Sequence, residues 1–115
     1  MSHEDPTVTN PTHYRTIFEN ELVRVLDYTD RPGESTTPHV HPNSVMVTLT
    51  DFQRRLMTDA GDREVDLPAN RAVWLPAQRH AGENIGQTPT HTILIELKGE
   101  AAGVVADDVV GPAIL

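Results

Sequence analysis

The 115-residue sequence contains no cysteine. This absence excludes disulfides, iron–sulfur clusters, zinc–thiolate centres and thiol nucleophiles, so any bound metal must be held by nitrogen and oxygen ligands. Aromatic residues contribute only 4% of the chain, and the core must therefore be built largely from Val, Leu and Ile. No segment approaches the run of about 20 apolar residues that a membrane-spanning helix requires.

Basic residues are also scarce. Nine Lys and Arg are set against seventeen Asp and Glu, which gives a formal net charge of −8. Nucleic acids and anionic membranes select basic surfaces, so we expect neither as a partner. A signal peptide has a basic region followed by an apolar run, and the N-terminal sequence lacks this pattern. We therefore expect a cytoplasmic protein.

Short segments of β-forming residues alternate with turn residues through most of the chain, and no segment shows a persuasive helical period. This pattern predicts an all-β sandwich or barrel in a single domain. The expected strands cover residues 14–18, 22–27, 37–41, 44–50, 52–58, 63–67, 71–75 and 90–98.

The two ends of the chain differ from this β pattern. Residues 1–13 are polar and contain two prolines, which predicts a flexible N-terminal arm before a barrel over residues 14–98. Residues 99–115 are rich in Ala and Val, with paired valines at 104–105 and 109–110. We expect this tail to pack on the barrel or on a dimer partner.

Three histidines carry the chemical signal of the sequence. His39 and His41 are separated by one residue, so on a strand their side chains point to the same face. His80, on a neighbouring strand, could direct a third ring to the same point. Three neutral imidazoles that converge in this way make a metal site with open positions. The alternative is three structural histidines that line a wet cavity.

These residues resemble the two motifs of the cupin family. Gly33 precedes the His-x-His pair of His39 and His41, and His80 and Asn84 have the spacing of the second motif. The resemblance covers roughly residues 20–98. It implies a double-stranded β-helix, or jelly roll, in which these three histidines hold a divalent transition metal (Fe, Mn, Ni, Cu or Zn). Barrels of this family commonly pair through a sheet, so a homodimer is expected.

The sequence also departs from the family pattern. Met46 stands near the position of the usual glutamate ligand, Asn70 stands where the second motif begins with Gly, and the segment 76–80 is one residue short. Three-histidine sites are a known cupin variant, seen in thiol and diketone dioxygenases. Segments 38–42 and 74–84 also resemble a branch of very small single-domain cupins associated with β-alanine catabolism.

Five further residues are candidates for the pocket, each with a plainer interpretation. Met46 either fills the core or lies near the metal, and Trp74 either fills the core or forms a pocket wall. Arg54 either points inward to anchor a substrate carboxylate or forms a surface ion pair. Gln78 either supports a metal ligand or belongs to a loop. His91 is either a pocket acid/base, the one catalytic candidate, or a surface histidine.

Two classes of function fit these features. The first is a metal-dependent enzyme acting on a small oxygenated molecule or carboxylic acid, of the dioxygenase, isomerase or lyase type. The second is a non-catalytic cupin that binds a small molecule, for example as a sensor. Metal content and turnover distinguish the two classes.

Overall fold

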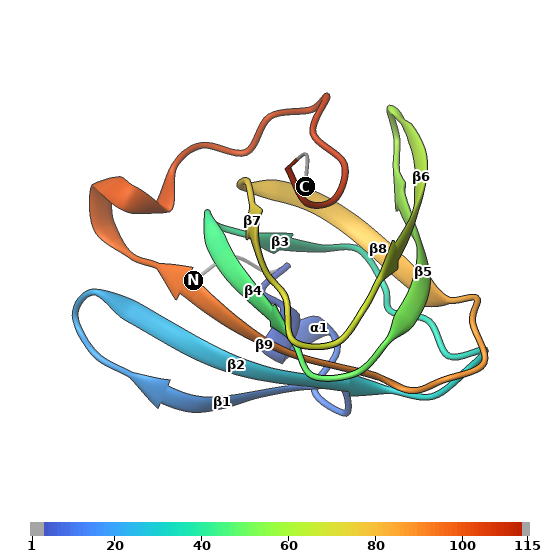
Figure 1. The fold of residues 1–115 in the computed structure, drawn as a ribbon. Helices are drawn as coiled ribbons and strands as arrows, with labels where there is room; N and C mark the ends of the chain where they lie inside the picture. The colour runs from blue at the N-terminus through green and yellow to red at the C-terminus, as the bar shows by residue number, and fades with distance from the viewer. Residues whose placement is uncertain (1–3, 114–115) are drawn as a thin grey trace.

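The computed structural model describes residues 4–113, which form two antiparallel β-sheets facing each other (Figure 1). One sheet has the strand order β1-β2-β9-β4-β7 and the other has the order β3-β8-β5-β6. This arrangement confirms the predicted all-β barrel. The strands are β1 (Tyr14–Glu19), β2 (Val23–Asp30), β3 (His39–His41), β4 (Ser44–Thr48), β5 (Phe52–Thr58), β6 (Gly61–Leu67), β7 (Ala72–Leu75), β8 (Gln78–Asn84) and β9 (Thr90–Leu97).

Two apolar clusters fill the space between the sheets. Met46 packs against both of them, which suits its flexible side chain. Each fully buried Leu or Phe stabilises the fold by about 1.5–3 kcal/mol through removal of apolar surface from water. The first cluster contains Tyr14, Leu26, Tyr28, Leu75 and Leu94, and the second contains Phe52, Leu56, Val65 and Leu67.

The N-terminal segment differs from the flexible arm that the sequence predicts. Residues 6–9 form a short helix, α1 (Pro6–Thr9), which Asp5 caps by accepting a hydrogen bond from the backbone N–H of Thr7. Asn10 binds the backbone of Thr37, and Asp5 pairs with Arg24 at 2.8 Å. Four residues are too few to show a helical period, so the polar composition suggested a loose arm. Residues 1–3 and 114–115 lie outside the described part of the chain.

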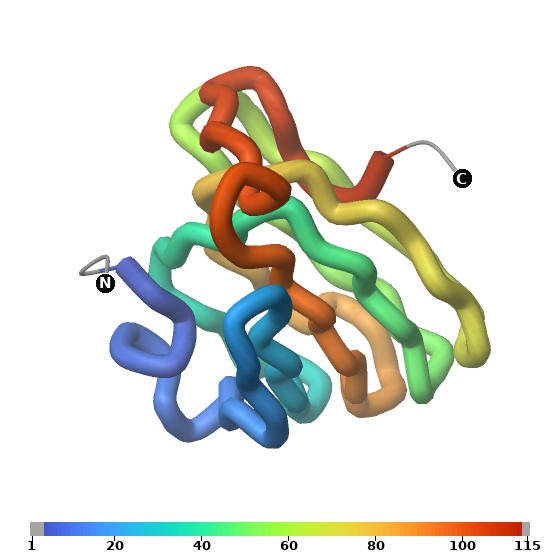
Figure 2. The backbone as a smooth tube through the Cα atoms, turned by 90° about the vertical axis from the view of Figure 1, so that its left-hand side faces the viewer, coloured from blue at the N-terminus to red at the C-terminus, as the bar shows by residue number. Residues whose placement is uncertain are grey.

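The tail returns to the barrel after the 3₁₀ helix η1 (Gly99–Ala102). Figure 2 shows its last part running beside the hairpin of β5 and β6. The Arg63 guanidinium donates to the carbonyl oxygens of Val110 and Pro112 at 3.0 and 2.7 Å. Within residues 4–113, no helix has the length and apolar character needed to cross a membrane.

Candidate metal centre

The three predicted histidines come together on one pair of strands. β3 and β8 are antiparallel, and His39 lies directly opposite His80 in their register. His41 follows two residues later on the same face of β3. One ligand nitrogen from each ring lies within 4.8 Å of the other two, and all three side chains are buried. The expected convergence of the rings is therefore confirmed.

The outer nitrogen of each ring is held by an acceptor. These contacts join His39 Nδ1 to Thr37 O at 2.7 Å, His41 Nδ1 to Glu96 Oε2 at 3.1 Å and His80 Nδ1 to Gln78 Oε1 at 2.7 Å. The amide of Asn10 also approaches His39 Nδ1, at 3.4 Å, but the shorter contact to a carbonyl requires a proton on that nitrogen. Each ring thus carries its proton on Nδ1 and presents the lone pair of Nε2.

Burial keeps two of these rings neutral. Desolvation lowers the pKa of His39 to about 3, with a further contribution from the neighbouring His41. Desolvation also places the pKa of His80 well below its ordinary value, and both neighbouring rings add to this effect. A neutral imidazole is the form that binds a metal, so the environment prepares these rings as ligands without acid or base added.

A buried carboxylate supports His41 from behind. Glu96 is only 2% exposed, and Arg24 donates to its Oε1 through Nε at 2.9 Å. The other carboxylate oxygen accepts from His41 Nδ1. A carboxylate–histidine contact of this kind fixes the orientation of a metal-binding ring and raises its basicity. Arg24 is therefore the counter-ion of this buried carboxylate.

Tyr14 reaches the inner side of the histidines, a position that the sequence did not indicate. Its Oη lies 3.2 Å from His39 Nε2 and 3.3 Å from His41 Nε2. Burial raises the pKa of the Tyr14 phenol, so it keeps its proton when no cation is present. We call Tyr14 and the three histidines the histidine cluster. Within this cluster, the Nε2 lone pairs of His39 and His41 have one phenol proton between them.

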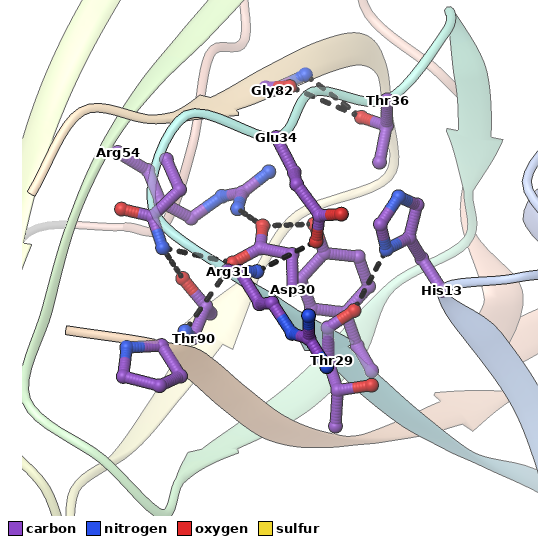
Figure 3. Close-up of polar contacts among 12 residues, drawn as sticks. His13, Thr29, Asp30, Arg31, Glu34, Thr36, Arg54, Gly82 and Thr90 are labelled. Carbon is purple, nitrogen blue, oxygen red and sulfur yellow. Dashed lines mark hydrogen bonds and ion pairs between the residues drawn. The ribbon is translucent and has the colours of Figure 1, made fainter.

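A second polar group surrounds Asp30, as Figure 3 shows. Asp30 Oδ2 accepts from the Tyr28 hydroxyl and from Arg54 Nη1. Asp30 Oδ1 accepts from Asn84 Nδ2 at 2.9 Å and from the backbone N–H of Thr90 at 3.3 Å. Burial alone would raise the pKa of Asp30, but the charge of Arg54 and these hydrogen bonds lower it below its usual value. We call these five residues the Asp30 cluster.

Arg54 points inward, as one of the two predicted alternatives required. It is 8% exposed, and its guanidinium carbon lies 5.0 Å from the centre of the Tyr28 ring. Gly82 makes this packing possible, because a Cβ at that position would lie 2.2 Å from Arg54 Nη2. Arg55 points the other way and pairs with Glu64 on the exposed face.

A cavity of about 40 Å³ connects the two clusters. Its walls include Tyr14, His41, Met46, Phe52, Arg54 and His80. The volume is enough for a few water molecules or a very small ligand. The histidine nitrogens, the Arg54 guanidinium and apolar side chains therefore line one cavity, which is the usual composition of a small-molecule site.

The remaining predicted pocket residues take different places. Met46 lines the cavity, whereas Gln78 is fully buried behind His80, to which its Oε1 is bonded. Trp74 does not line the cavity and is 42% exposed, because alternate residues of β7 face outward. His91 lies on the outer face of β9 and its Nε2 is 2.7 Å from Asp27 Oδ1. Neither pocket role, the wall of Trp74 nor the acid/base of His91, fits this geometry.

The donor set fits a transition metal. Three imidazole nitrogens suit Fe, Mn, Ni, Cu or Zn, and the second nitrogen of each ring is already held in place. Met46 lines the same cavity at the position where the sequence predicted that the usual carboxylate is missing. The residues present thus meet the requirements of a three-histidine centre.

The two sheets and their strand order define the cupin-type double-stranded β-helix. The structure is similar to a cupin domain from Bordetella pertussis Tohama I, with a TM-score of 0.70 and 26% identity over 75% of this chain and 92% of that one. It is also similar to a conserved double-stranded β-helix protein from Klebsiella pneumoniae (TM-score 0.61, 22% identity, 78% of each chain). An RmlC-like cupin from Methanocaldococcus jannaschii has a TM-score of 0.58 and 13% identity over 73% of this chain and 77% of that one.

No protein-family model matches the sequence, and no curated protein shows significant sequence similarity to it. The structural likeness to several cupins supports the resemblance that the two histidine motifs indicated.

Proposed function

We propose that this protein is a metal-dependent cupin enzyme acting on a small oxygenated molecule or carboxylic acid, through dioxygenase, isomerase or lyase chemistry. One observation carries the proposal. Three buried histidines bring one ligand nitrogen each to within 4.8 Å of the others, and the Nε2 atoms of His39 and His41 have one phenol proton between them. An arrangement so rich in acceptors is well suited to a divalent cation.

His39, His41 and His80 would hold the metal. When bound, the metal would supply Lewis acidity or activate dioxygen. Glu96, Gln78 and the Thr37 carbonyl keep the three rings in place, so the protein would not need to reorganise them on binding.

Arg54 would select the substrate. Its guanidinium lines the same cavity as His41 and His80, and a guanidinium can bind a carboxylate through two parallel hydrogen bonds. Asp30 fixes the orientation of Arg54 through Nη1. Phe52 and Leu56 line the apolar side of the cavity and would exclude water from the reacting groups. The small volume restricts the substrate to a few heavy atoms.

The decisive experiment measures metal binding by equilibrium dialysis against each candidate divalent metal. The wild-type protein is expected to bind one equivalent, and His80→Ala is expected to lose binding. His13→Ala is the matched control, because His13 contacts the Thr29 carbonyl rather than the histidine cluster. Absence of binding by the wild type after supplementation would contradict the proposed function.

Turnover distinguishes the enzyme from the sensor. The metal-loaded protein is tested against small carboxylic acids and diketones, with oxygen uptake and product formation as readouts. Arg54→Gln is expected to raise KM for carboxylates more than for neutral substrates. Ligand-induced stabilisation without any turnover would favour the non-catalytic binding cupin instead.

We also propose a homodimer that pairs through the outer face of the five-stranded sheet. Val25, Ile95, Val45 and Trp74 form one row across four neighbouring strands on this face. An apolar row of this kind is a suitable interface. Sedimentation at micromolar concentration is expected to show a dimer, and Val45→Lys is expected to shift it to a monomer. A monomeric wild type would contradict the proposal.

The finer assignments rest on sequence features. We propose that the chain belongs to the branch of small cupins associated with β-alanine catabolism, on the basis of segments 38–42 and 74–84. The cytoplasmic location and the absence of nucleic-acid and membrane partners stay predictions from composition and charge.

A further inference from the structure

We infer that Tyr14 is the fourth protein ligand of the metal centre and binds through its phenol oxygen. The inference rests on the proposed three-histidine site and names the group that replaces the missing carboxylate. Met46 occupies the sequence position near which a glutamate ligand is expected. Tyr14 approaches the histidines from β1, at the edge of the five-stranded sheet, whereas the histidines lie on the four-stranded sheet.

The position of the Tyr14 oxygen matches that of a ligand. Oη lies 3.2 Å from His39 Nε2 and 3.3 Å from His41 Nε2. Around a metal with bonds of about 2.1 Å, adjacent ligand atoms are about 3.0–3.4 Å apart in octahedral and tetrahedral geometries. The oxygen is therefore as far from both nitrogens as one ligand of a metal is from the next.

A purely structural hydrogen bond explains this position less well. A phenol has one proton and can donate it to one acceptor, yet Oη is almost equally distant from two lone pairs. The Nδ1 atoms of both rings already have acceptors, so neither ring can return a proton to the phenol oxygen. A cation bound by the two nitrogens and the oxygen would satisfy all three atoms together.

The carboxylates near the site are engaged elsewhere. Glu96 contacts His41 at Nδ1, on the side of the ring that faces away from Tyr14. Asp30 accepts four hydrogen bonds from other groups, two at each oxygen. Neither carboxylate is directed at the Nε2 atoms, and among residues 4–113 the Tyr14 phenol is the side-chain oxygen that contacts those of His39 and His41.

The N-terminal segment holds Tyr14 in this position. Its backbone N–H donates to Asn10 O at 3.0 Å, and its ring centre lies 4.6 Å from that of Tyr28, its partner in the β1–β2 register. Asn10 in turn binds the backbone of Thr37, close to His39. The ordered segment before β1 thus has a specific purpose, because it fixes the phenol oxygen against the metal-binding rings.

Metal binding through the phenol oxygen breaks one bond of the protein, the O–H bond of Tyr14. The oxygen–metal bond forms as the phenol O–H bond breaks, and the proton passes to bulk water. The imidazoles would bind the metal through Nε2 and keep the proton on Nδ1, so they release no proton on metal binding. The wild-type protein should therefore release about one proton for each metal ion bound.

Copper(II) is the probe for the experiment, because it binds nitrogen–oxygen sites tightly and its phenolate complexes absorb visible light. Metal-free protein is titrated with Cu²⁺ at pH 8. The wild type is expected to develop a phenolate-to-copper charge-transfer band and to release about one proton per Cu²⁺. Tyr14→Phe is expected to bind Cu²⁺ about 10-fold or more weakly, with neither the band nor the proton. Tyr28→Phe is the matched control, since it removes another buried phenol of the same cavity and should keep both signals.

Each result separates this inference from the proposed function. Stoichiometric copper binding without the band in the wild type, or an unchanged band in Tyr14→Phe, would overturn the role of Tyr14 and leave the three-histidine site standing. No copper binding by the wild type would reject the metal site itself. Resonance Raman spectra of the wild type and Tyr28→Phe, excited in the band, must show tyrosinate ring modes, which keeps the test independent of the folding of Tyr14→Phe.

Discussion

The barrel encloses two polar clusters of similar size and burial, and their hydrogen bonding is opposite in character. The Asp30 cluster is balanced, because four donors meet the two oxygens of one carboxylate. The histidine cluster is unbalanced, because the Nε2 lone pairs of His39 and His41 share one phenol proton. Buried polar groups in stable proteins are normally satisfied.

This difference separates a structural group from a functional one. A saturated carboxylate has no capacity left for a ligand, and its contribution is to hold Arg54 and the strands β2, β5, β8 and β9 in register. A cluster with surplus acceptors can satisfy them by taking up a cation. The comparison predicts that changes at Asp30 act on stability, whereas changes in the histidine cluster act on metal binding.

Loss of the Asp30 charge is expected to have the largest effect. Asp30→Asn leaves the buried guanidinium of Arg54 without its counter-ion, and we expect the free energy of unfolding to fall by about 3–5 kcal/mol. Urea denaturation measures the change. Glu64→Gln is the control, because it breaks an exposed pair with Arg55 and should cost about 1 kcal/mol or less. Equal losses in the two variants would contradict the structural role of the Asp30 cluster.

Acid should affect the two clusters in different pH ranges. His39 and His80 have lowered pKa values in the folded state, so the unfolded chain takes up their protons first. Stability is therefore full above about pH 6.5 and falls below it, by up to about 1.4 kcal/mol per pH unit for each ring. Asp30 also has a lowered pKa, so its contribution is full above about pH 3.9 and is lost only as the pH falls below that value.

Urea unfolding of the metal-free protein between pH 8 and pH 3 measures this prediction. Replacing His39 with Gln should reduce the slope between pH 6.5 and pH 4, and Asp30→Asn should reduce only the loss at lower pH. A free energy of unfolding that stays constant from pH 8 to pH 5 would contradict this prediction, because the folded and unfolded states would then take up the same number of protons.

The strands that carry apolar side chains could be predicted from the sequence. The extent of β8, whose inward side chains are polar or absent, could not. β4 has three consecutive apolar residues between Ser44 and Thr48, and its position could be predicted from this β-forming run. The inward residues of β8 are Gln78, His80, Gly82 and Asn84, which give no hydrophobic period. The inward face of β9 could not be predicted from its apolar residues, because Ile93 and Ile95 face outward while Thr92 and Glu96 face the interior.

The candidate site could be predicted only in part for a related reason. His39 and His41 share a face by spacing alone, and a family motif supplied His80. Tyr14 has no fixed spacing to the histidines, since it reaches them through the pairing of β1 with the rest of its sheet. The outward direction of His91 could not be predicted either, because the face of β9 depends on which of its two sets of alternate residues the barrel encloses.

Removing the support behind His80 should weaken metal binding without abolishing it. The Gln78 amide accepts from His80 Nδ1 and also bonds the backbone N–H and carbonyl of Gly111. Gln78→Ala is expected to lower metal affinity by about 10- to 100-fold, measured by competition with a chelating indicator. Arg63→Ala releases the tail carbonyls without touching His80, so an equal loss in that variant would assign the effect to the tail.

The smallest effect is expected at His91, which lies outside the barrel. This residue tests whether metal binding depends only on the histidine cluster inside it. His91 pairs with Asp27 on the outer face of β9, and its side chain is 37% exposed. Because an exposed pair contributes little, His91→Gln should change the free energy of unfolding by about 0.5 kcal/mol or less. Metal affinity should stay within about twofold of the wild type, since the ring lies outside the cavity. Denaturation and chelator competition on one preparation measure both quantities. A large loss of metal affinity would contradict the assignment of metal binding to the histidine cluster, because His91 lies on the outer face of the sheet.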